Sequence, residues 1–88
     1  MAFHVLTNDK KVLKEYDRQS TIYAKAIIEA LYTTSDTFKQ PVSNAVIEAL
    51  ALAQSHVICS LPKTLRPRMT EFAHSTLDMA ISLESERE

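Results

Sequence analysis

The sequence predicts an all-α protein: an antiparallel bundle of three main helices, over residues 8–33, 41–61 and 67–84, completed by dimerisation. Three observations predict this fold class. Apolar residues recur at helical spacing in each of the three segments. The connections between the segments are short, so consecutive helices are expected to pack antiparallel. The 88 residues include no glycine, on which tight β-hairpin turns depend.

The first helix, over residues 8–33, is amphipathic. Its heptad face has a spacing close to seven residues and contains Leu13, Tyr16, Ser20, Tyr23, Ile27, Ala30 and Leu31. The opposite face is charged, as expected of a side in water. The hydroxyls of Tyr16 and Tyr23 need polar partners or access to water, and Ser20 lies between them. Before the helix, residues 1–7 are expected to form a short arm that docks on the bundle.

The helix over residues 41–61 is the most apolar stretch and the centre of the predicted fold. Its only clearly polar strip is formed by Asn44, Glu48 and Ser55. A helix that is apolar almost all round is expected to be buried on more than one side. Pro41 suits its first position, and Pro62 ends it, because a proline excludes the preceding residue from the α conformation.

The third helix, over residues 67–84, starts at Pro67, a residue favoured in the first turn. It has one apolar face, formed by Met69, Phe72, Ala73, Thr76, Met79, Ala80 and Leu83. Residues 84–88 are charged and are expected to form a frayed acidic tail. The whole chain, residues 1–88, is predicted to be a single helical domain.

Two amphipathic helices cover only part of the central helix, so other apolar side chains remain near the surface. We call these residues the apolar flank; they are Ile47, Leu52, Ile58, Leu77 and Ile81. An exposed apolar patch on the order of several hundred Å² usually marks an interface. Symmetric dimers are the commonest oligomers, so we predict a homodimer, with another protein as the alternative partner.

The densest positive charge is the segment KTLRPR, which contains Lys63, Arg66 and Arg68. A helix N-terminus with basic neighbours attracts phosphate, and helix-turn-helix proteins place the start of a helix in the major groove. These residues therefore suggest an alternative function, a nucleic-acid-binding transcriptional regulator. Three basic residues on a surface loop are most often only solvated, and a contact with an acidic protein surface is an alternative of the same weight as nucleic acid. The formal net charge of −1 gives no overall attraction to nucleic acid.

Two residue pairs have the spacing of metal ligands. Glu71 and His74 match the Glu-x-x-His spacing of helical di-iron proteins, but helical geometry places them on the solvent side. His56 and Cys59 are three residues apart, yet zinc needs two further ligands and the chain has no second His/Cys pair. Packing beneath another helix is the expected role of His56 and Cys59. A small helical metal-binding protein is a remote alternative, and we predict no bound metal or cofactor.

The residue content argues against catalysis. Phosphate-binding loops, dinucleotide sites and nucleophile elbows all require glycine, which is absent. Cys59 has only His56 as a nearby base, and no small-molecule substrate is evident. We therefore predict a non-enzymatic protein–protein interaction module: a regulator, adaptor, inhibitor or complex subunit.

The composition, 45% hydrophobic and 24% charged, is typical of globular proteins. A single cysteine allows no intrachain disulfide and fits a reducing cytosol. No stretch reaches the roughly 18 consecutive apolar residues of a membrane span. The first residues lack the pattern of a secretory signal. We expect a cytoplasmic protein with no membrane partner.

Overall fold

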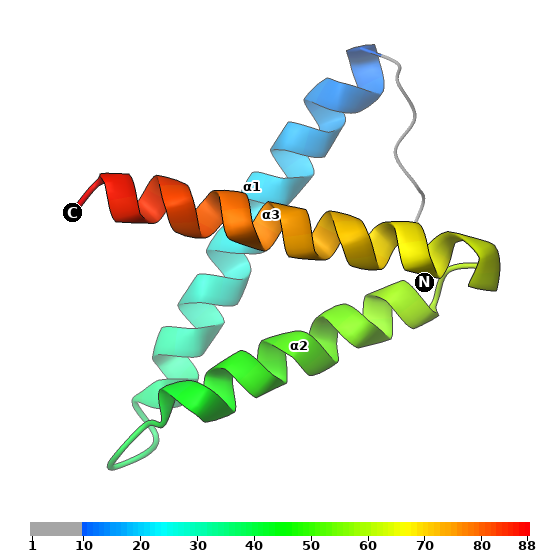
Figure 1. Cartoon of the computed structure of the whole chain (residues 1–88). Helices are drawn as coiled ribbons and strands as arrows, with labels where there is room; N and C mark the ends of the chain where they lie inside the picture. The colour runs from blue at the N-terminus through cyan, green and yellow to red at the C-terminus, as the bar shows by residue number, and fades with distance from the viewer. Residues whose placement is uncertain (1–9) are drawn as a thin grey trace. The chain divides into compact units, whose positions relative to one another are not determined.

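The computed structural model describes residues 10–88, with side chains from residue 13 onward. Every regular element in this range is helical, which confirms an all-α fold with three main helices for the described residues (Figure 1). The elements are α1 (Lys10–Ser35), α2 (Ser43–Cys59), the single 3₁₀ turn η1 (Lys63–Leu65) and α3 (Arg66–Glu86). The predicted arm over residues 1–7 lies outside the described residues.

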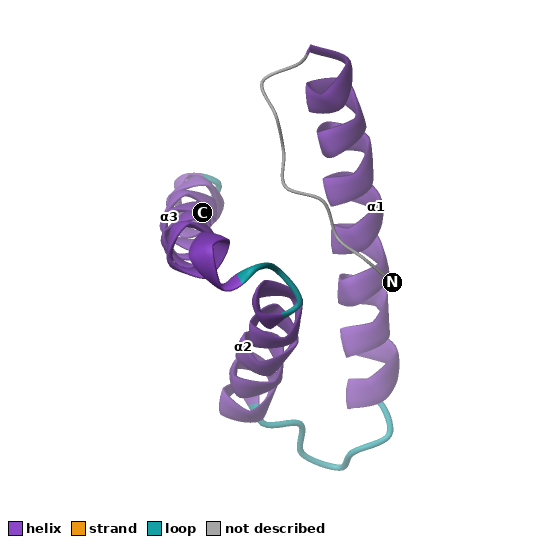
Figure 2. Cartoon of the chain, turned by 90° about the vertical axis from the view of Figure 1, so that its right-hand side faces the viewer, coloured by secondary structure: helices purple, strands orange, loops and turns teal. Residues whose placement is uncertain are grey.

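The described chain divides into two compact units whose boundary falls inside α2, between Leu50 and Ala51. The N-terminal unit, residues 10–50, contains α1, the following loop and the first half of α2. The C-terminal unit, residues 51–88, contains the rest of α2, η1 and α3. The loops that join the helices are short (Figure 2). The antiparallel bundle and the single domain over residues 1–88 concern the assembly of these units and stay predictions.

α1 continues two residues beyond the predicted end at Thr33, to Ser35. Short polar residues such as those after Thr33 can compete with a helix for backbone hydrogen bonds. Here the helical bonding continues, because the Asp36 N–H donates to the carbonyl of Tyr32 at 3.1 Å. The Thr37 hydroxyl donates to the carbonyl of Thr34 at 2.6 Å, and the Phe38 N–H donates to the carbonyl of Ser35 at 3.1 Å. These bonds satisfy carbonyls that a helix end otherwise leaves unpaired.

α2 is two residues shorter than predicted at each end. At its start, the Ala45 N–H donates to the carbonyl of Val42 at 3.1 Å, so the first turn forms after Pro41 rather than at it. At its end, the Leu61 N–H donates to the carbonyl of Ile58 at 3.0 Å. This is a 3₁₀-type bond, which tightens the chain before the proline that follows.

α3 begins at Arg66, one residue earlier than predicted, and has Pro67 in its first turn. It extends to Glu86, two residues into the tail that was expected to fray. The Arg87 N–H donates to the carbonyl of Glu84 at 3.2 Å, and their charged groups lie 3.8 Å apart. Helical hydrogen bonding therefore continues into the tail, and an exposed ion pair joins two residues that are one turn apart.

Burial is concentrated at the turn between α2 and α3. Leu61, with 7% of its surface exposed, is the single buried residue among residues 13–88. The half-buried residues of the C-terminal unit lie at the end of α2, in the turn and in the first half of α3; they are Ile58, Leu65, Arg66, Met69, Ala73 and Thr76. The second half of the apolar face of α3, with Met79 and Leu83, is exposed. In the N-terminal unit, Leu31, Ser35 and Val46 are half-buried.

Candidate protein-interaction surface

The apolar flank lies on α2 and α3 and is largely open to solvent. The exposed fractions are 67% for Leu52, 66% for Ile47, 57% for Leu77 and 55% for Ile81. Ile58 is half-buried near the turn. Full burial of an apolar side chain of this size is worth roughly 1.5–3 kcal/mol. Burying the exposed flank against a partner would therefore favour association.

On α2 the flank consists of two separate shoulders. Ile47 and Ile58 are eleven residues apart and share one side of the helix at 100° per residue. Leu52 lies on the other side of the polar strip. The flank therefore has two apolar edges on α2, with polar residues between them. A partner that covers both shoulders of α2 must therefore reach across Glu48 or contact the helix from two sides.

α1 exposes more apolar surface than its heptad spacing indicated. Four large residues of the heptad face, Leu13, Tyr16, Tyr23 and Ile27, are exposed. Ile22, Ile28 and Tyr32 are also exposed, although they lie roughly 100–140° around the helix from Ile27. The heptad period did not reveal these three residues. The available signal was composition, because the second half of α1 contains Lys25 and Glu29 as its charged residues.

The Ser20 hydroxyl does not hydrogen-bond to the tyrosines of the heptad face. Its hydroxyl donates to the backbone carbonyl of Asp17 at 3.2 Å. Tyr16 and Tyr23 are exposed, so their hydroxyls have access to water. Covering the heptad face with another helix would restore the need for a polar partner or an exit to solvent for these hydroxyls.

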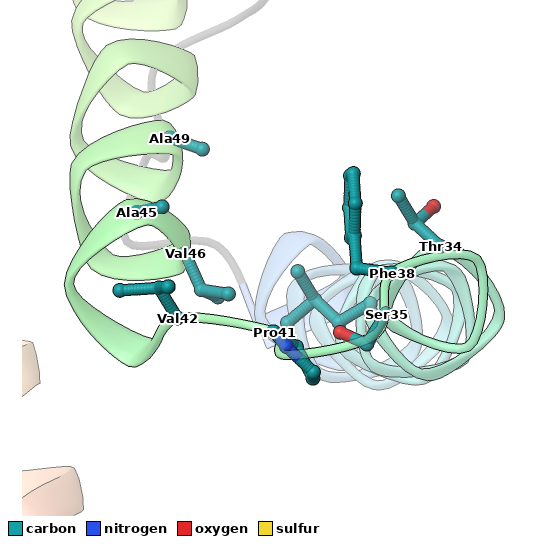
Figure 3. Close-up of a pocket in the computed structure, with 9 residues that line it drawn as sticks. Thr34, Ser35, Phe38, Pro41, Val42, Ala45, Val46 and Ala49 are labelled. Atoms are coloured by element: carbon teal, nitrogen blue, oxygen red, sulfur yellow. The ribbon is translucent and has the colours of Figure 1, made fainter.

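A shallow apolar pocket lies at the corner between α1 and the start of α2, wholly within the N-terminal unit. Its volume is about 200 Å³, and it is lined by Leu31, Thr34, Ser35, Phe38, Pro41, Val42, Ala45, Val46 and Ala49. Figure 3 shows Phe38 beside the end of α1 and Val46 directed towards it from α2. Apart from two hydroxyl-bearing residues the lining is apolar, so the pocket suits an apolar side chain better than a charged group.

The Arg66 side chain caps the C-terminal end of α2. Its Nε donates to the carbonyl of Leu61 at 3.1 Å, and its Nη2 donates to the carbonyl of Cys59 at 2.9 Å. A helix C-terminus has unpaired carbonyls and a partial negative charge, both of which favour a cation. Sequence reasoning missed this role. Its signal was a basic residue shortly after a helix end. The guanidinium keeps three further N–H donors, so the predicted anion contact by Arg66 stays a prediction.

The other two basic residues of KTLRPR lie near the start of α3. Lys63 lies in η1, Arg68 lies in the first turn of α3, and both side chains are exposed. No side chain caps the N-terminus of α3. The Arg66 N–H already donates to the carbonyl of Lys63, and Pro67 has no N–H, so attraction of an anion here depends on the two cations and the helix dipole. Phosphate contact by Lys63 and Arg68 stays a prediction.

The two candidate metal pairs are both open to solvent. Glu71 and His74 are exposed on α3, on the side that helical geometry predicted. His56 and Cys59 are exposed as well, instead of packing beneath another helix. Across the described residues, no three His, Cys, Asp or Glu side chains gather closely enough to hold a metal ion.

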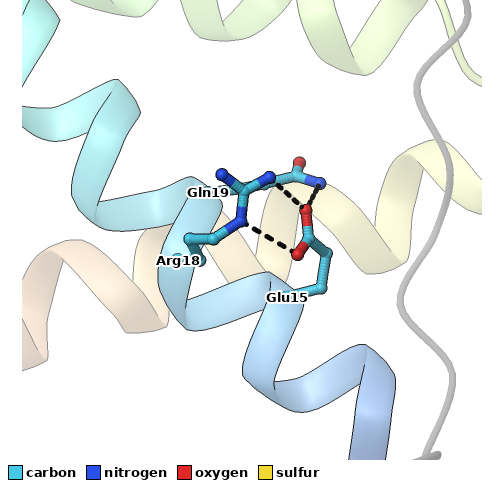
Figure 4. A network of polar contacts seen from close by, with 3 residues as sticks. All are labelled: Glu15, Arg18 and Gln19. Atoms are coloured by element: carbon cyan, nitrogen blue, oxygen red, sulfur yellow. Dashed lines mark hydrogen bonds and ion pairs between the residues drawn. The ribbon is translucent and has the colours of Figure 1, made fainter.

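A polar cluster on the charged side of α1 joins Glu15, Arg18 and Gln19 (Figure 4). Arg18 donates from Nη2 to Glu15 Oε1 at 2.7 Å and from Nε to Oε2 at 3.0 Å, and Gln19 Nε2 donates to Oε1 at 3.0 Å. The bonds from Arg18, and secondarily that from Gln19, lower the pKa of Glu15 from 4.5 to about 2. The same pair raises the pKa of Arg18. The cluster is fully solvated, so it marks the water-facing side of α1 and adds little stability.

Replacing Arg18 with Ala is expected to raise the pKa of Glu15 from about 2 back towards 4.5. A depressed carboxyl pKa means that the folded state favours the ionised form. Its stabilising contribution is therefore complete above pH 4.5 and is lost as the pH falls towards 2. Carbon-13 NMR titration of the Glu15 carboxyl in both proteins measures the shift. The same low pKa in the Arg18→Ala variant would contradict the bidentate geometry.

Comparisons of the chain with protein-family models, with curated proteins and with solved structures found no match. Among the helices that the structure describes, none combines the length and the apolar character needed to cross a membrane.

Proposed function

We propose that this protein is a non-enzymatic protein–protein interaction module that acts as a homodimer. Exposure of apolar side chains carries the proposal: α1, α2 and α3 all present large apolar residues to solvent, and Leu61 is the one buried residue among residues 13–88. Native domains are stable by only about 5–15 kcal/mol, and a small chain depends on burying most of its apolar residues. Packing of the three helices into a bundle covers part of this surface, and a second copy supplies the rest of the cover.

In the proposed assembly, the three helices pack as an antiparallel bundle and the apolar flank faces the second copy. A two-fold axis places the same residues of both copies in the interface. Covering the exposed part of the flank on two copies yields on the order of 10 kcal/mol before costs. The loss of translational and rotational freedom on association costs about 4–15 kcal/mol. The dimer is therefore expected to dissociate on dilution.

Residue content supports the remaining parts of the proposal. The sequence has no glycine for a phosphate-binding loop or a nucleophile elbow, which favours a role without catalysis. Cys59 is exposed and free, and a free surface thiol suits a reducing compartment. We accordingly place the module in the cytoplasm, as a regulator, adaptor, inhibitor or subunit that works through contacts.

Dilution is expected to uncover the apolar flank. A dye that fluoresces on apolar surface should therefore give more signal per mole of protein as the concentration falls through the dissociation constant of the dimer. A matched titration of the Leu52→Asp variant provides the reference for a flank that is never covered. The proposal would be contradicted if the dye fluorescence per mole of wild-type protein stayed constant and equalled that of the variant at every concentration.

The alternative, a nucleic-acid-binding regulator, is supported by the exposed side chains of Lys63 and Arg68 beside the start of α3. Two phosphate contacts per chain, or about four per dimer, predict a slope near −3.6 when the logarithm of affinity is plotted against the logarithm of salt concentration. The measurement is DNA binding across a salt series, with a Lys63→Ala/Arg68→Ala double variant as the control. Such a slope, lost in the double variant, would favour this alternative.

A further inference from the structure

We propose that two copies of this chain bind one zinc ion between them, through His56 and Cys59 of each copy. The inference rests on the proposed homodimer and names a ligand held at its two-fold axis. Both residues lie in the last turn of α2, within the C-terminal unit. Three features support the site: the type and spacing of the two side chains, the hydrogen bonds that hold their backbone, and their position beside Leu52.

The first feature is a pair of metal-ligating side chains on one side of a helix. Within the C-terminal unit, His56 and Cys59 are both exposed. Residues three apart on a helix have Cβ atoms about 5–6 Å from each other. Their side chains can therefore reach a single ion, as the Glu-x-x-His pairs of helical di-iron proteins do. Imidazole nitrogen and thiolate sulfur are preferred zinc ligands, so one chain supplies half of a site with two cysteines and two histidines.

The second feature is that hydrogen bonds hold the backbone of both residues, although they lie at a helix end. The Ser60 N–H donates to the carbonyl of His56 at 3.2 Å. Arg66 Nη2 donates to the carbonyl of Cys59 at 2.9 Å, a group that a helix end otherwise leaves unpaired. Metal sites require ligands that are held in place before the ion arrives. The capped last turn of α2 meets this requirement.

The third feature is that the pair shares the shoulder of α2 that contains Leu52. Leu52, His56 and Cys59 are separated by four and three residues, so they follow one side of the helix. In the proposed homodimer Leu52 faces the second copy. The most apolar side of α2, centred near Ala53, lies about 100° around the helix from Leu52 and is the side that packs within the proposed bundle.

A two-fold axis at this shoulder completes the zinc site. The axis brings the same residues of both copies together, so the second copy supplies the His/Cys pair that one chain lacks. A tetrahedron contains two-fold axes, and two identical pairs of ligands therefore satisfy the four-coordinate geometry of structural zinc. The partner copy is thus part of the site, and a single chain cannot form it.

The charges of the ion and its ligands balance. Each Cys59 thiol releases its proton to solvent and binds as a thiolate, while each His56 binds as neutral imidazole. Two thiolates cancel the double positive charge of zinc, so the interface covers no unpaired charge. Because the ion binds the dimer and not the single chain, zinc is expected to tighten a dimer that otherwise dissociates on dilution.

Zinc titration of the wild-type protein measures the stoichiometry. The titration contains a reducing agent, which prevents a disulfide between the two copies of Cys59. The proposal predicts saturation at one zinc ion per two chains, read by competition with a zinc-binding dye. Cobalt in the same site should show the intense visible absorption of a tetrahedral ion and the near-ultraviolet bands of thiolate ligation. Saturation at one ion per chain, or cobalt spectra without thiolate bands, would overturn the proposal.

Variants of the two ligands test their roles separately. Cys59→Ser and His56→Ala are each expected to abolish the stoichiometric binding of zinc. His74→Ala is the matched control, because His74 is also an exposed histidine but lies on α3. It should leave the stoichiometry unchanged and the zinc affinity within about twofold. Circular dichroism verifies that each variant remains helical. Zinc affinity that survives in the Cys59→Ser variant means that the ion binds elsewhere and the proposal is wrong.

The dissociation constant of the dimer separates this inference from the proposed function. Sedimentation velocity is run with zinc and with a chelator. Zinc should lower the constant of the wild type by at least about 100-fold and leave that of the Cys59→Ser variant within about twofold. If the wild type dimerises equally well in both conditions and binds no zinc, the zinc site is wrong and the homodimer stands. A wild-type protein that is monomeric at all concentrations, with and without zinc, overturns both.

Discussion

Leu52→Asp is expected to convert the dimer to a monomer. Leu52 is among the most exposed large apolar residues of α2, with 67% of its surface open to solvent. In the proposed dimer this surface is covered, so the substitution buries a carboxylate without a partner in each copy. A rise in dissociation constant of at least about 100-fold, or roughly 2.7 kcal/mol, is the expected result. Sedimentation velocity over a concentration series measures it.

Ser75→Asp is the control, because it adds the same charge at an exposed position on the side of α3 away from Leu77 and Ile81. It is expected to leave the dissociation constant within about twofold, since surface substitutions usually change free energies by no more than about 0.5 kcal/mol. Circular dichroism of both variants verifies that the helices are retained. Equal dimer affinity of the Leu52→Asp variant and the wild type would exclude Leu52 from the interface.

Arg66→Ala is expected to destabilise the turn that joins α2 to α3. The substitution removes two charge-assisted hydrogen bonds, to the carbonyls of Cys59 and Leu61. Because water can reach part of this site, we expect a loss of about 1–2 kcal/mol in the free energy of unfolding rather than the full value of two such bonds. For a chain of this length, that loss lowers the melting temperature by about 4–16 °C.

Thermal unfolding at one fixed protein concentration measures the effect, since the stability of a dimer depends on concentration. Arg68→Ala is the control, because Arg68 is an exposed cation in the same segment and no described side-chain hydrogen bond involves it. Arg66→Lys should recover part of the loss, because lysine keeps the charge but not the planar pair of donors. An Arg66→Ala variant as stable as the Arg68→Ala variant would contradict the closing role of Arg66.

The helices could be predicted from the sequence because their determinants are local. Apolar spacing defined all three helices, and Pro62 and Pro67 marked the turn between the second and the third. The ends differed by one or two residues because single hydrogen bonds decide them. The Asp36 N–H, for example, prolongs α1 by donating to the carbonyl of Tyr32 at 3.1 Å.

The candidate surface could be predicted in part. Counting residues around the central helix was enough to expect Leu52 and Ile47 near the surface, and both are exposed. The direction of the Arg66 side chain was beyond sequence reasoning, because it depends on where the turn places the carbonyls of Cys59 and Leu61. The apolar pocket beside Phe38 depends in the same way on the path of the loop after α1. How the helices pack against one another depends on contacts between residues distant in sequence, which no local pattern specifies.

Light scattering of the purified protein across a wide concentration range tests the homodimer. A homodimer gives a mass of twice the 9.9 kDa chain at high concentration, with a fall towards the mass of one chain on dilution. A mass of 9.9 kDa at every concentration, from a protein that remains helical, would contradict the homodimer. The apolar flank would then be a surface for a different protein.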